Sequence, residues 1–355
     1  MAGTPDVTED AGTPGPGPVW GVPLGDDDAA ALDLTSLWYE DDHGTARPIW
    51  DVRVEVARLY ASPGGPVMGD VPWDRLCHAY GWATDVPELL AQVRGGDDAA
   101  AKQALIHLDN KICHQGGSSV AAPFCIPFLL RSAVDAPAPR RVGLVSVAVA
   151  AGRDNPFGTL RTDVLNAVAG ETALMVDNCG YPMNWTQQAA RDALAADTPL
   201  LARLLADADA GTRACAAFAL ATASAAAGET PTALLRRQLS REAQAAVCAG
   251  LVLAIAERMS TYGSRAEGMR WAQSVWEDAG EPPGTRLAAA VGWLCLTDVP
   301  PPEQLSELVT DEVSRGTASV LLGARWLRHF DFDRSDGGVD RWLLRLLDEA
   351  RTDTA

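Results

Sequence analysis

Proline recurs in this chain at the start of short apolar segments, and this recurrence constrains the fold more than any other feature. Pro87, Pro127, Pro199 and Pro231 each open a Leu-rich stretch, and a second apolar stretch follows each after a short polar connection. Proline is favoured in the first turn of a helix, because its missing N–H has no partner there. Pro87 and Pro127 are 40 residues apart and Pro199 and Pro231 are 32 apart, in or near the range of two-helix repeats. The sequence therefore predicts a series of antiparallel helix pairs.

The first pair can be placed residue by residue. Residues 86–93 carry apolar side chains at helical spacing and stop at Gly95-Gly96, and a second helix is predicted over residues 99–113. Asp97 and Asp98 precede this second helix. A carboxylate there caps exposed N–H groups and complements the positive end of the helix dipole.

Composition and a second recurrence extend the pattern. Aromatic residues make up only 6% of the chain and alternating β-branched runs are scarce, which favours helix over sheet. Thr212-Arg213, followed by small residues, returns as Thr285-Arg286 at the same place in its unit. Because one helix pair cannot bury both of its faces alone, the pairs are expected to stack. We therefore expect an all-α protein built as an α-solenoid.

Two segments resemble a known family. The stretch LCHAYG at residues 76–81 and the stretch ICHQG at residues 112–116 are similar to the "HAYG" and "HQG" segments of an actinobacterial HEAT-repeat family among the bacterial PBS-lyase-like HEAT proteins. The resemblance covers roughly residues 73–153 well and residues 192–258 only as generic HEAT repeats. It implies a right-handed solenoid of HEAT-like antiparallel helix pairs, and it implies no particular biochemical activity.

The chain also divides by composition. Six segments are predicted in order: a disordered acidic Gly/Pro-rich arm (1–28), an irregular N-terminal cap (29–72) with a short helix at 53–60, HEAT-like repeats (73–153), an irregular insertion (154–185), further HEAT-like repeats (186–258), and Trp-rich C-terminal helical repeats and cap (259–355). Helices are expected within the last segment at 302–314, 318–329 and 339–350. Long ordered insertions are often functional.

The net charge limits the choice of partner. With 47 Asp and Glu against 29 Lys and Arg, the formal charge is -18. Non-specific nucleic-acid binding depends on the release of phosphate counterions by basic residues, so this balance argues against a nucleic-acid partner. It predicts instead a protein partner with a basic docking surface.

Cysteine usage and hydropathy predict a cytoplasmic protein. Seven cysteines are scattered without a CxxC pair, and several lie within apolar helical stretches, as buried thiols do in a reducing compartment. We expect no membrane span, since no apolar run approaches 18 residues, and the N-terminus has no signal-peptide pattern.

Candidate binding residues lie in the two family-like segments. His78, Tyr80, His114 and Gln115 are polar or aromatic residues near predicted helix ends, where they would form a recognition loop on one edge of the solenoid. The structural alternative is that the glycines after Gln115 stop one helix and a serine caps the next. Tyr181 and Trp185, in the insertion, are further candidate contacts.

No cofactor is predicted, but one possible metal set is present. The dipeptides Cys77-His78 and Cys113-His114 are 36 residues apart, close to one repeat, and with Cys179 they have the ligand types that zinc prefers. The alternative is that both histidines are structural residues at repeat corners.

Several functions stay open. The leading hypothesis is a non-catalytic scaffold that binds its partner through a concave face, since stacked helix pairs create such surfaces. An immunity or antitoxin protein would be one form of it, and an enzyme on the same scaffold, either a DNA glycosylase or a metal-dependent enzyme, is the alternative. Carboxylates along the inner helices would favour the scaffold, whereas arginine with tryptophan would favour nucleic acid.

Overall fold

The computed structural model describes residues 38–40, 43–49, 51–62, 65–153, 161, 163–166, 177, 179–327 and 338–352. This part of the chain is mostly α-helical, with only short strands, so the predicted all-α class is confirmed. The predicted arm at 1–28 lies outside the described residues, as does much of the predicted insertion at 154–185.

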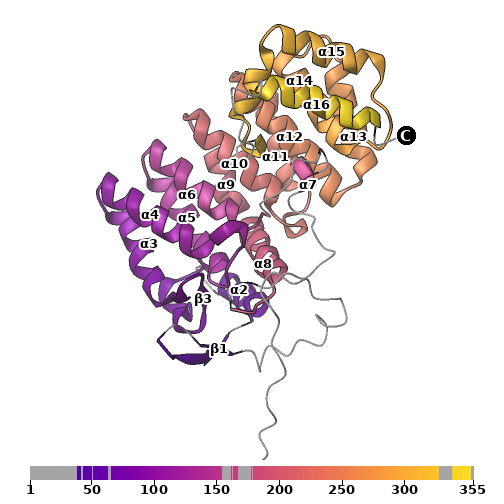
Figure 1. Cartoon of the computed structure of the whole chain (residues 1–355). Helices are drawn as coiled ribbons and strands as arrows, with labels where there is room; N and C mark the ends of the chain where they lie inside the picture. The colour runs from indigo at the N-terminus through magenta and orange to yellow at the C-terminus, as the bar shows by residue number, and fades with distance from the viewer. Residues whose placement is uncertain are drawn as a thin grey trace, which may run out of the picture.

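Ten helices of the described chain pack as consecutive pairs. These are α3 (Val86–Gly95) with α4 (Asp98–Ile112), α5 (Ala122–Asp135) with α6 (Ala138–Ala150), α9 (Thr198–Leu205) with α10 (Ala210–Thr222), α11 (Thr230–Leu239) with α12 (Ala245–Tyr262), and α13 (Arg265–Glu277) with α14 (Pro283–Leu296). The second members α4, α6, α10, α12 and α14 pack side by side in that order, and so do the first members α3, α5, α9 and α11. Figure 1 shows the resulting succession, from α3 and α4 at one end to α15 and α16 at the other.

Shorter elements surround these pairs. The α-helices are α2 (Val52–Ala61), α7 (Asp163–Asn166), α8 (Met183–Ala196), α15 (Glu303–Ser314) and α16 (Gly338–Thr352); the strands are β1 (Trp38–Glu40), β2 (Ala46–Pro48), β3 (Cys77–His78) and β4 (Gly81–Trp82). β1 pairs with β2, and β3 with β4, each antiparallel. The 3-10 segments are η2 (Met68–Asp70), η3 (Trp73–Arg75), η4 (Ala83–Asp85), η5 (His114–Gly116), η6 (Ala225–Ala227), η7 (Thr317–Gly323) and η8 (Arg325–Leu327). α2 and α8 pack against each other and against α5.

Local sequence signals explain where most helices begin. Pro87, Pro199 and Pro231 lie in the first turn of α3, α9 and α11, as predicted. The carboxylate of Asp97 accepts a hydrogen bond of 2.8 Å from the backbone N–H of Ala100, and it therefore caps α4. Asp209 caps α10 in the same way, through the N–H of Thr212 at 2.7 Å.

Two helix predictions are wrong. α5 begins at Ala122 with Pro123 in its first turn, so Pro127 lies inside the helix instead of opening it. The stretch predicted as a helix at 318–329 forms η7 and η8, separated at Ala324, and residues 328–337 lie outside the described chain.

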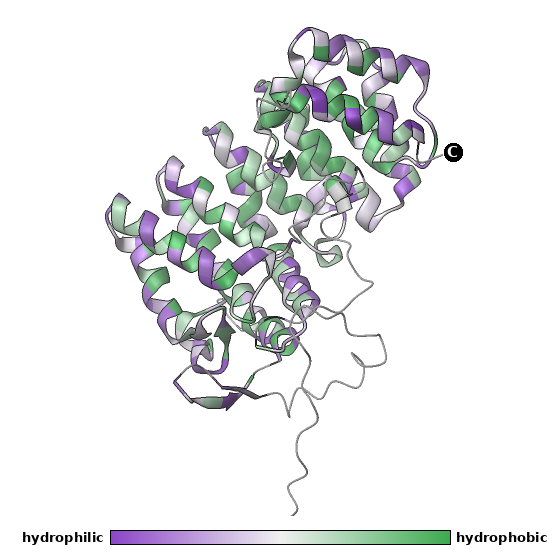
Figure 2. Cartoon of the chain, viewed as in Figure 1, coloured by the Kyte–Doolittle hydropathy of each residue, from purple (hydrophilic) through white to green (hydrophobic). Residues whose placement is uncertain are grey.

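The core is one continuous cluster, and α12 lies at its centre. Residues Val247 to Arg258 of α12 are all buried, because α10, α11, α13, α14, η7 and α7 surround the helix. Figure 2 shows the hydrophobic residues that run along this helix. Among the described helices α12 alone is long and apolar enough to cross a membrane, so the expectation that no run approaches that length does not hold; two thirds of it is buried inside the protein.

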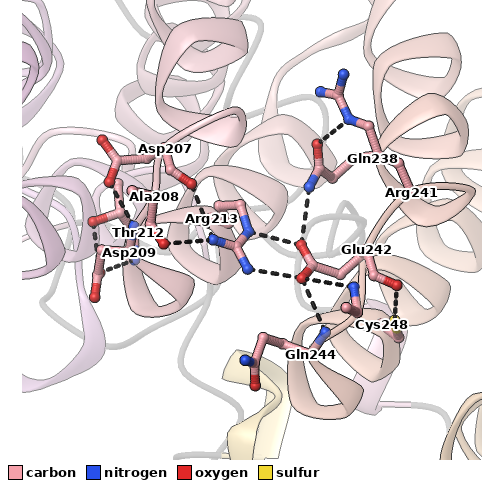
Figure 3. Close-up of polar contacts among 11 residues, drawn as sticks. Asp207, Ala208, Asp209, Thr212, Arg213, Gln238, Arg241, Glu242, Gln244 and Cys248 are labelled. Atoms are coloured by element: carbon pink, nitrogen blue, oxygen red, sulfur yellow. Dashed lines mark hydrogen bonds and ion pairs between the residues drawn. The ribbon is translucent and has the colours of Figure 1, made fainter.

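Ion pairs connect successive helix pairs along the edge where each first helix turns into its second. Arg140 of α6 pairs with Asp98 of α4 at 2.6 Å, and Arg141 pairs with Asp207 in the turn before α10. Arg213 of α10 continues the series: its Nη1 donates to the carbonyl oxygens of Asp207 and Ala208, and its Nε and Nη2 bind Glu242 in the turn before α12 (Figure 3). Arginine is suited to this position because its guanidinium has five donors in a planar fork.

Candidate functional site

Four of the predicted binding residues meet at one corner, which we call the histidine corner and define as His78, Tyr80, Asp85, Lys111, His114 and Gln115. The β3–β4 hairpin carries His78 and Tyr80, and it docks on the end of α4 through a 2.9 Å hydrogen bond from Ala79 N–H to the carbonyl of Lys111. His114 and Gln115 follow directly after α4 in η5. The corner therefore lies on the edge of the stack opposite to the arginine series.

His78 is the structural centre of this corner. Its side chain is 2% exposed, and its Nδ1 accepts a hydrogen bond of 3.0 Å from the N–H of Tyr80. Because Nδ1 accepts, the proton is on Nε2, which donates to Asp85 Oδ1 at 3.0 Å. Burial lowers the pKa of His78, so the ring is neutral and its tautomer is set by its neighbours. Both ring nitrogens are already used within the protein.

Tyr80 and His114 form the exposed part of the corner. Tyr80 is 59% exposed, its hydroxyl is 3.2 Å from His114 Nδ1, and the two rings meet edge to face at 5.2 Å. The ammonium of Lys111 lies 5.5 Å from the centre of the Tyr80 ring. Gln115 is exposed with φ of 49°, and it is the only non-glycine residue of the described chain at positive φ. The corner thus presents an aromatic ring, an imidazole and an amide at the surface.

Tyr181 and Trp185 lie elsewhere and hold α2 in place. Tyr181 is fully buried; its hydroxyl accepts from the N–H of Val52 at 3.0 Å and donates to Asp51 at 3.3 Å. The guanidinium of Arg53 lies 3.6 Å above the Trp185 ring. Tyr181 therefore has no surface to offer to a partner, and this candidate is wrong for the arrangement that the structure describes.

The five residues of the possible metal set do not converge. The thiols of Cys77 and Cys179 hydrogen-bond each other, while Cys113 lies near Cys125. Burial raises the pKa of all three of the set's thiols, which keeps them protonated, and a protonated thiol is a poor metal ligand. Within the part of the chain that the structure describes, no three His, Cys, Asp or Glu side chains could hold a metal ion.

Arginine and tryptophan do occur beside the second-member helices, but they are buried. Arg153, after α6, makes two hydrogen bonds to Glu257 of α12 and lies 4.2 Å from the centre of the Phe218 ring. Trp326 of η8 donates to the same carboxylate. The segments η7, η8 and α7 pack against α10, α12 and α14. Arg153 and Trp326 therefore do not face an open groove of the kind that a nucleic acid needs.

A groove that sequence reasoning missed crosses the first-member helices α3, α5 and α9. Its volume is about 710 Å³, and Leu90, Phe128 and Leu200 are among its apolar lining residues. Each helix also contributes one arginine: Arg94, Arg131 and Arg203 line the groove together with a single carboxylate, that of Asp135. In a chain with a net charge of -18, this concentration of basic groups is unusual.

Arg131 is held in a defined position within this groove. Its Nη1 donates to the carbonyl of Pro66 at 2.7 Å. Gly65, at φ of 78°, lies against the same guanidinium, and a Cβ there would be only 2.8 Å from Nη2. Asp197 lies beneath, where it accepts a 2.7 Å hydrogen bond from Tyr60 and feels the charge of Arg131. No sequence motif marks the groove, because its arginines are 37 and 72 residues apart along the chain.

Comparison of the chain with protein-family models, curated proteins and solved structures finds no match in any of the three.

Proposed function

We propose that this chain is a non-catalytic scaffold of HEAT type that binds a protein partner in the cytoplasm. The paired helices, their shared core and the arginine series support an α-solenoid of HEAT-like antiparallel pairs. The HAYG and HQG segments support membership of the bacterial HEAT proteins, which implies a right-handed stack. In such a stack, each added pair extends a surface as well as the core.

The observation that carries the proposal is the excess of acidic groups: the net charge is -18, and carboxylates are exposed at the C-terminal end of the stack. Glu267 and Glu277 on α13, Glu303 and Glu307 on α15, and Asp278 in the turn after α13 are all exposed. Exposed carboxylates on a protein of net negative charge attract a basic partner and accelerate its association. We therefore propose that the partner docks through a basic surface here. We infer that the second-member helices line the concave face expected from the sequence; it is a weaker candidate, since η7, η8 and α7 pack against α10, α12 and α14.

The alternatives gain less support. A DNA glycosylase would place arginine and aromatic residues in an open basic groove, whereas Arg153 and Trp326 are closed over Glu257. A metal-dependent enzyme centred on Cys77, His78 and Cys113 would need side chains that converge, and these do not. An immunity or antitoxin protein would be a special case of the proposed scaffold.

The test is a crosslinked pull-down of the tagged full chain from its native host at low and moderate salt. The variant Glu303→Lys/Glu307→Lys reverses two of these exposed charges. Glu88→Lys/Asp192→Lys changes the net charge equally at exposed positions on α3 and α8. We expect a stoichiometric basic partner that is lost in the first variant and at higher salt, and kept in the second. Recovery of no protein partner, or equal loss in both variants, would overturn the proposal.

A further inference from the structure

We propose that the groove across α3, α5 and α9 binds an acidic peptide segment of a partner protein, with its carboxylates on Arg94, Arg131 and Arg203 and an apolar side chain on the floor formed by Leu90, Phe128 and Leu200. This inference rests on the proposed scaffold function and adds a second docking surface to it.

Charge is the first argument for this occupant. Three guanidinium groups face one lining carboxylate, Asp135, while the chain as a whole has 18 more acidic than basic groups. Arginine near the end of a helix also stabilises the helix dipole, and this explains Arg94 and Arg203, each in a last turn, taken singly. The helix dipole does not explain why arginines from the three neighbouring first-member helices α3, α5 and α9 line the same groove.

The build of the groove is the second argument. Arg131 is fixed by the carbonyl of Pro66 and by the space that Gly65 leaves, so its guanidinium is ordered before a ligand arrives. Ordering in advance reduces the entropy that binding costs. Nη2 of Arg131 lies against Gly65 while the side chain lines the groove, and the planar guanidinium of an arginine is suited to contact with a carboxylate.

The apolar floor selects a peptide over other anions. A volume of about 710 Å³ is within the range of ligand sites, and the leucines and phenylalanine beneath the arginines would bury an aliphatic or aromatic side chain. Long-range repulsion from the net charge of -18 acts on any acidic ligand and grows with its charge, so a nucleic-acid strand, with one phosphate per nucleotide, is disfavoured more than a peptide in which acidic and apolar residues alternate. A short segment with acidic residues beside apolar ones matches both parts of the groove.

The experiment is fluorescence anisotropy with the full chain and a labelled ten-residue peptide that alternates Glu with Leu or Phe. A peptide with Gln in place of each Glu tests the charge. Arg94→Ala/Arg203→Ala removes two lining arginines, and Arg236→Ala/Arg237→Ala is the matched control, because it removes two exposed arginines from the last turn of α11, outside the groove. Arg131 is left unchanged because it also supports the loop at Pro66.

We expect the Glu peptide to bind, and the Gln peptide and the Arg94/Arg203 variant each to weaken binding roughly tenfold, with the control variant unchanged. Equal loss in both variants, or equal binding of the two peptides, would overturn the proposal. So would displacement of the peptide by a ten-nucleotide single strand at similar concentration. A photo-crosslinking residue in place of Ala91, which lines the groove, tests one further occupant. A crosslink to residues 1–37 of the same chain would overturn the proposal and assign the groove to the chain's own acidic N-terminal segment.

The two proposals fail separately. Peptide binding with no partner in the pull-down would support the groove and overturn the scaffold function. The groove proposal alone would be overturned by a different set of results. In that case a partner is captured, the Glu peptide does not bind, and the Arg94/Arg203 variant captures the partner as well as the unchanged chain does.

Discussion

Arg153 and Glu257 form a buried ion pair between the turn after α6 and α12, with Nη1–Oε1 at 2.7 Å and Nη2–Oε2 at 2.9 Å. Thr222 of α10 accepts a further hydrogen bond from Arg153 Nη1, and Trp326 of η8 donates to Glu257. One pair of charges thus connects three helices of the stack to the segment that covers them. An ion pair of this kind is costly to break, because removal of one partner leaves the other charge buried alone.

Glu257→Gln is therefore expected to lower the free energy of unfolding by about 3–5 kcal/mol. Urea denaturation followed by circular dichroism measures this loss. The double variant Arg153→Met/Glu257→Leu leaves no buried charge, so we expect it to be more stable than Glu257→Gln. If the double variant is the less stable of the two, the cost comes from packing and not from the unpaired charge.

Glu242 is expected to make stability depend on pH in the acid range. Burial alone would raise the pKa of this carboxyl, but hydrogen bonds from Arg213, the N–H of Gln244 and Gln238 outweigh it and lower the pKa from 4.5 to about 2. The unfolded chain binds the proton first as the pH falls, so this stabilisation is full above pH 4.5 and is lost as the pH approaches 2.

The measurement is the pH dependence of the unfolding free energy of Glu242→Gln and of the unchanged chain between pH 5 and pH 2. We expect the unchanged chain to lose its advantage over the variant as the pH falls through this interval. A difference that stays constant with pH would contradict the assignment.

Gln115 occupies a left-handed conformation, with φ of 49° and ψ of 35°, that glycine adopts at no steric cost. Gln115→Gly is expected to stabilise the protein by up to about 1 kcal/mol, since the left-handed region costs other residues roughly 1–2 kcal/mol. Gln188→Gly is the control, because Gln188 is an exposed residue inside α8 where glycine costs about 1 kcal/mol. In urea denaturation we expect the free energy of unfolding to rise in Gln115→Gly and to fall in Gln188→Gly. An equal fall in both variants would show that Gln115 is not strained.

Removal of divalent metal is expected to leave the thermal midpoint of unfolding unchanged, because Cys77, Cys113 and Cys179 do not form one site. Cys113→Ser and Cys125→Ser are each expected to destabilise the protein, by up to about 1–3 kcal/mol at the buried Cys125 and by less at the half-buried Cys113, since a hydroxyl replaces a thiol. Differential scanning calorimetry with and without chelator checks the first expectation. The zinc hypothesis would be restored if chelator lowered the thermal midpoint of the unchanged chain and of Cys125→Ser but not that of Cys113→Ser.

Sequence reasoning succeeded where a short stretch decides the outcome. The turn at Gly95-Gly96, the cap at Asp97 and the prolines at positions 87, 199 and 231 act within one helical turn, so their effect can be read from neighbouring residues. Pro127 shows the limit of this reasoning. Two prolines, Pro123 and Pro127, precede the same leucines, and packing of the whole of α5 against α6 and α8 places the helix start at the first.

The sequence by itself determined that the chain is helical, that its helices come in pairs, and that its surface is acidic, because these follow from composition and local periodicity. Only the tertiary structure decided which distant residues meet. It brings Tyr80 to His114, buries Tyr181 beneath α2, and gathers Arg94, Arg131 and Arg203 on one groove. Among the described residues, it does not bring Cys77, Cys113 and Cys179 together as one metal site. Such contacts depend on the summed packing of many side chains across the stack, and no stretch of sequence encodes that sum alone.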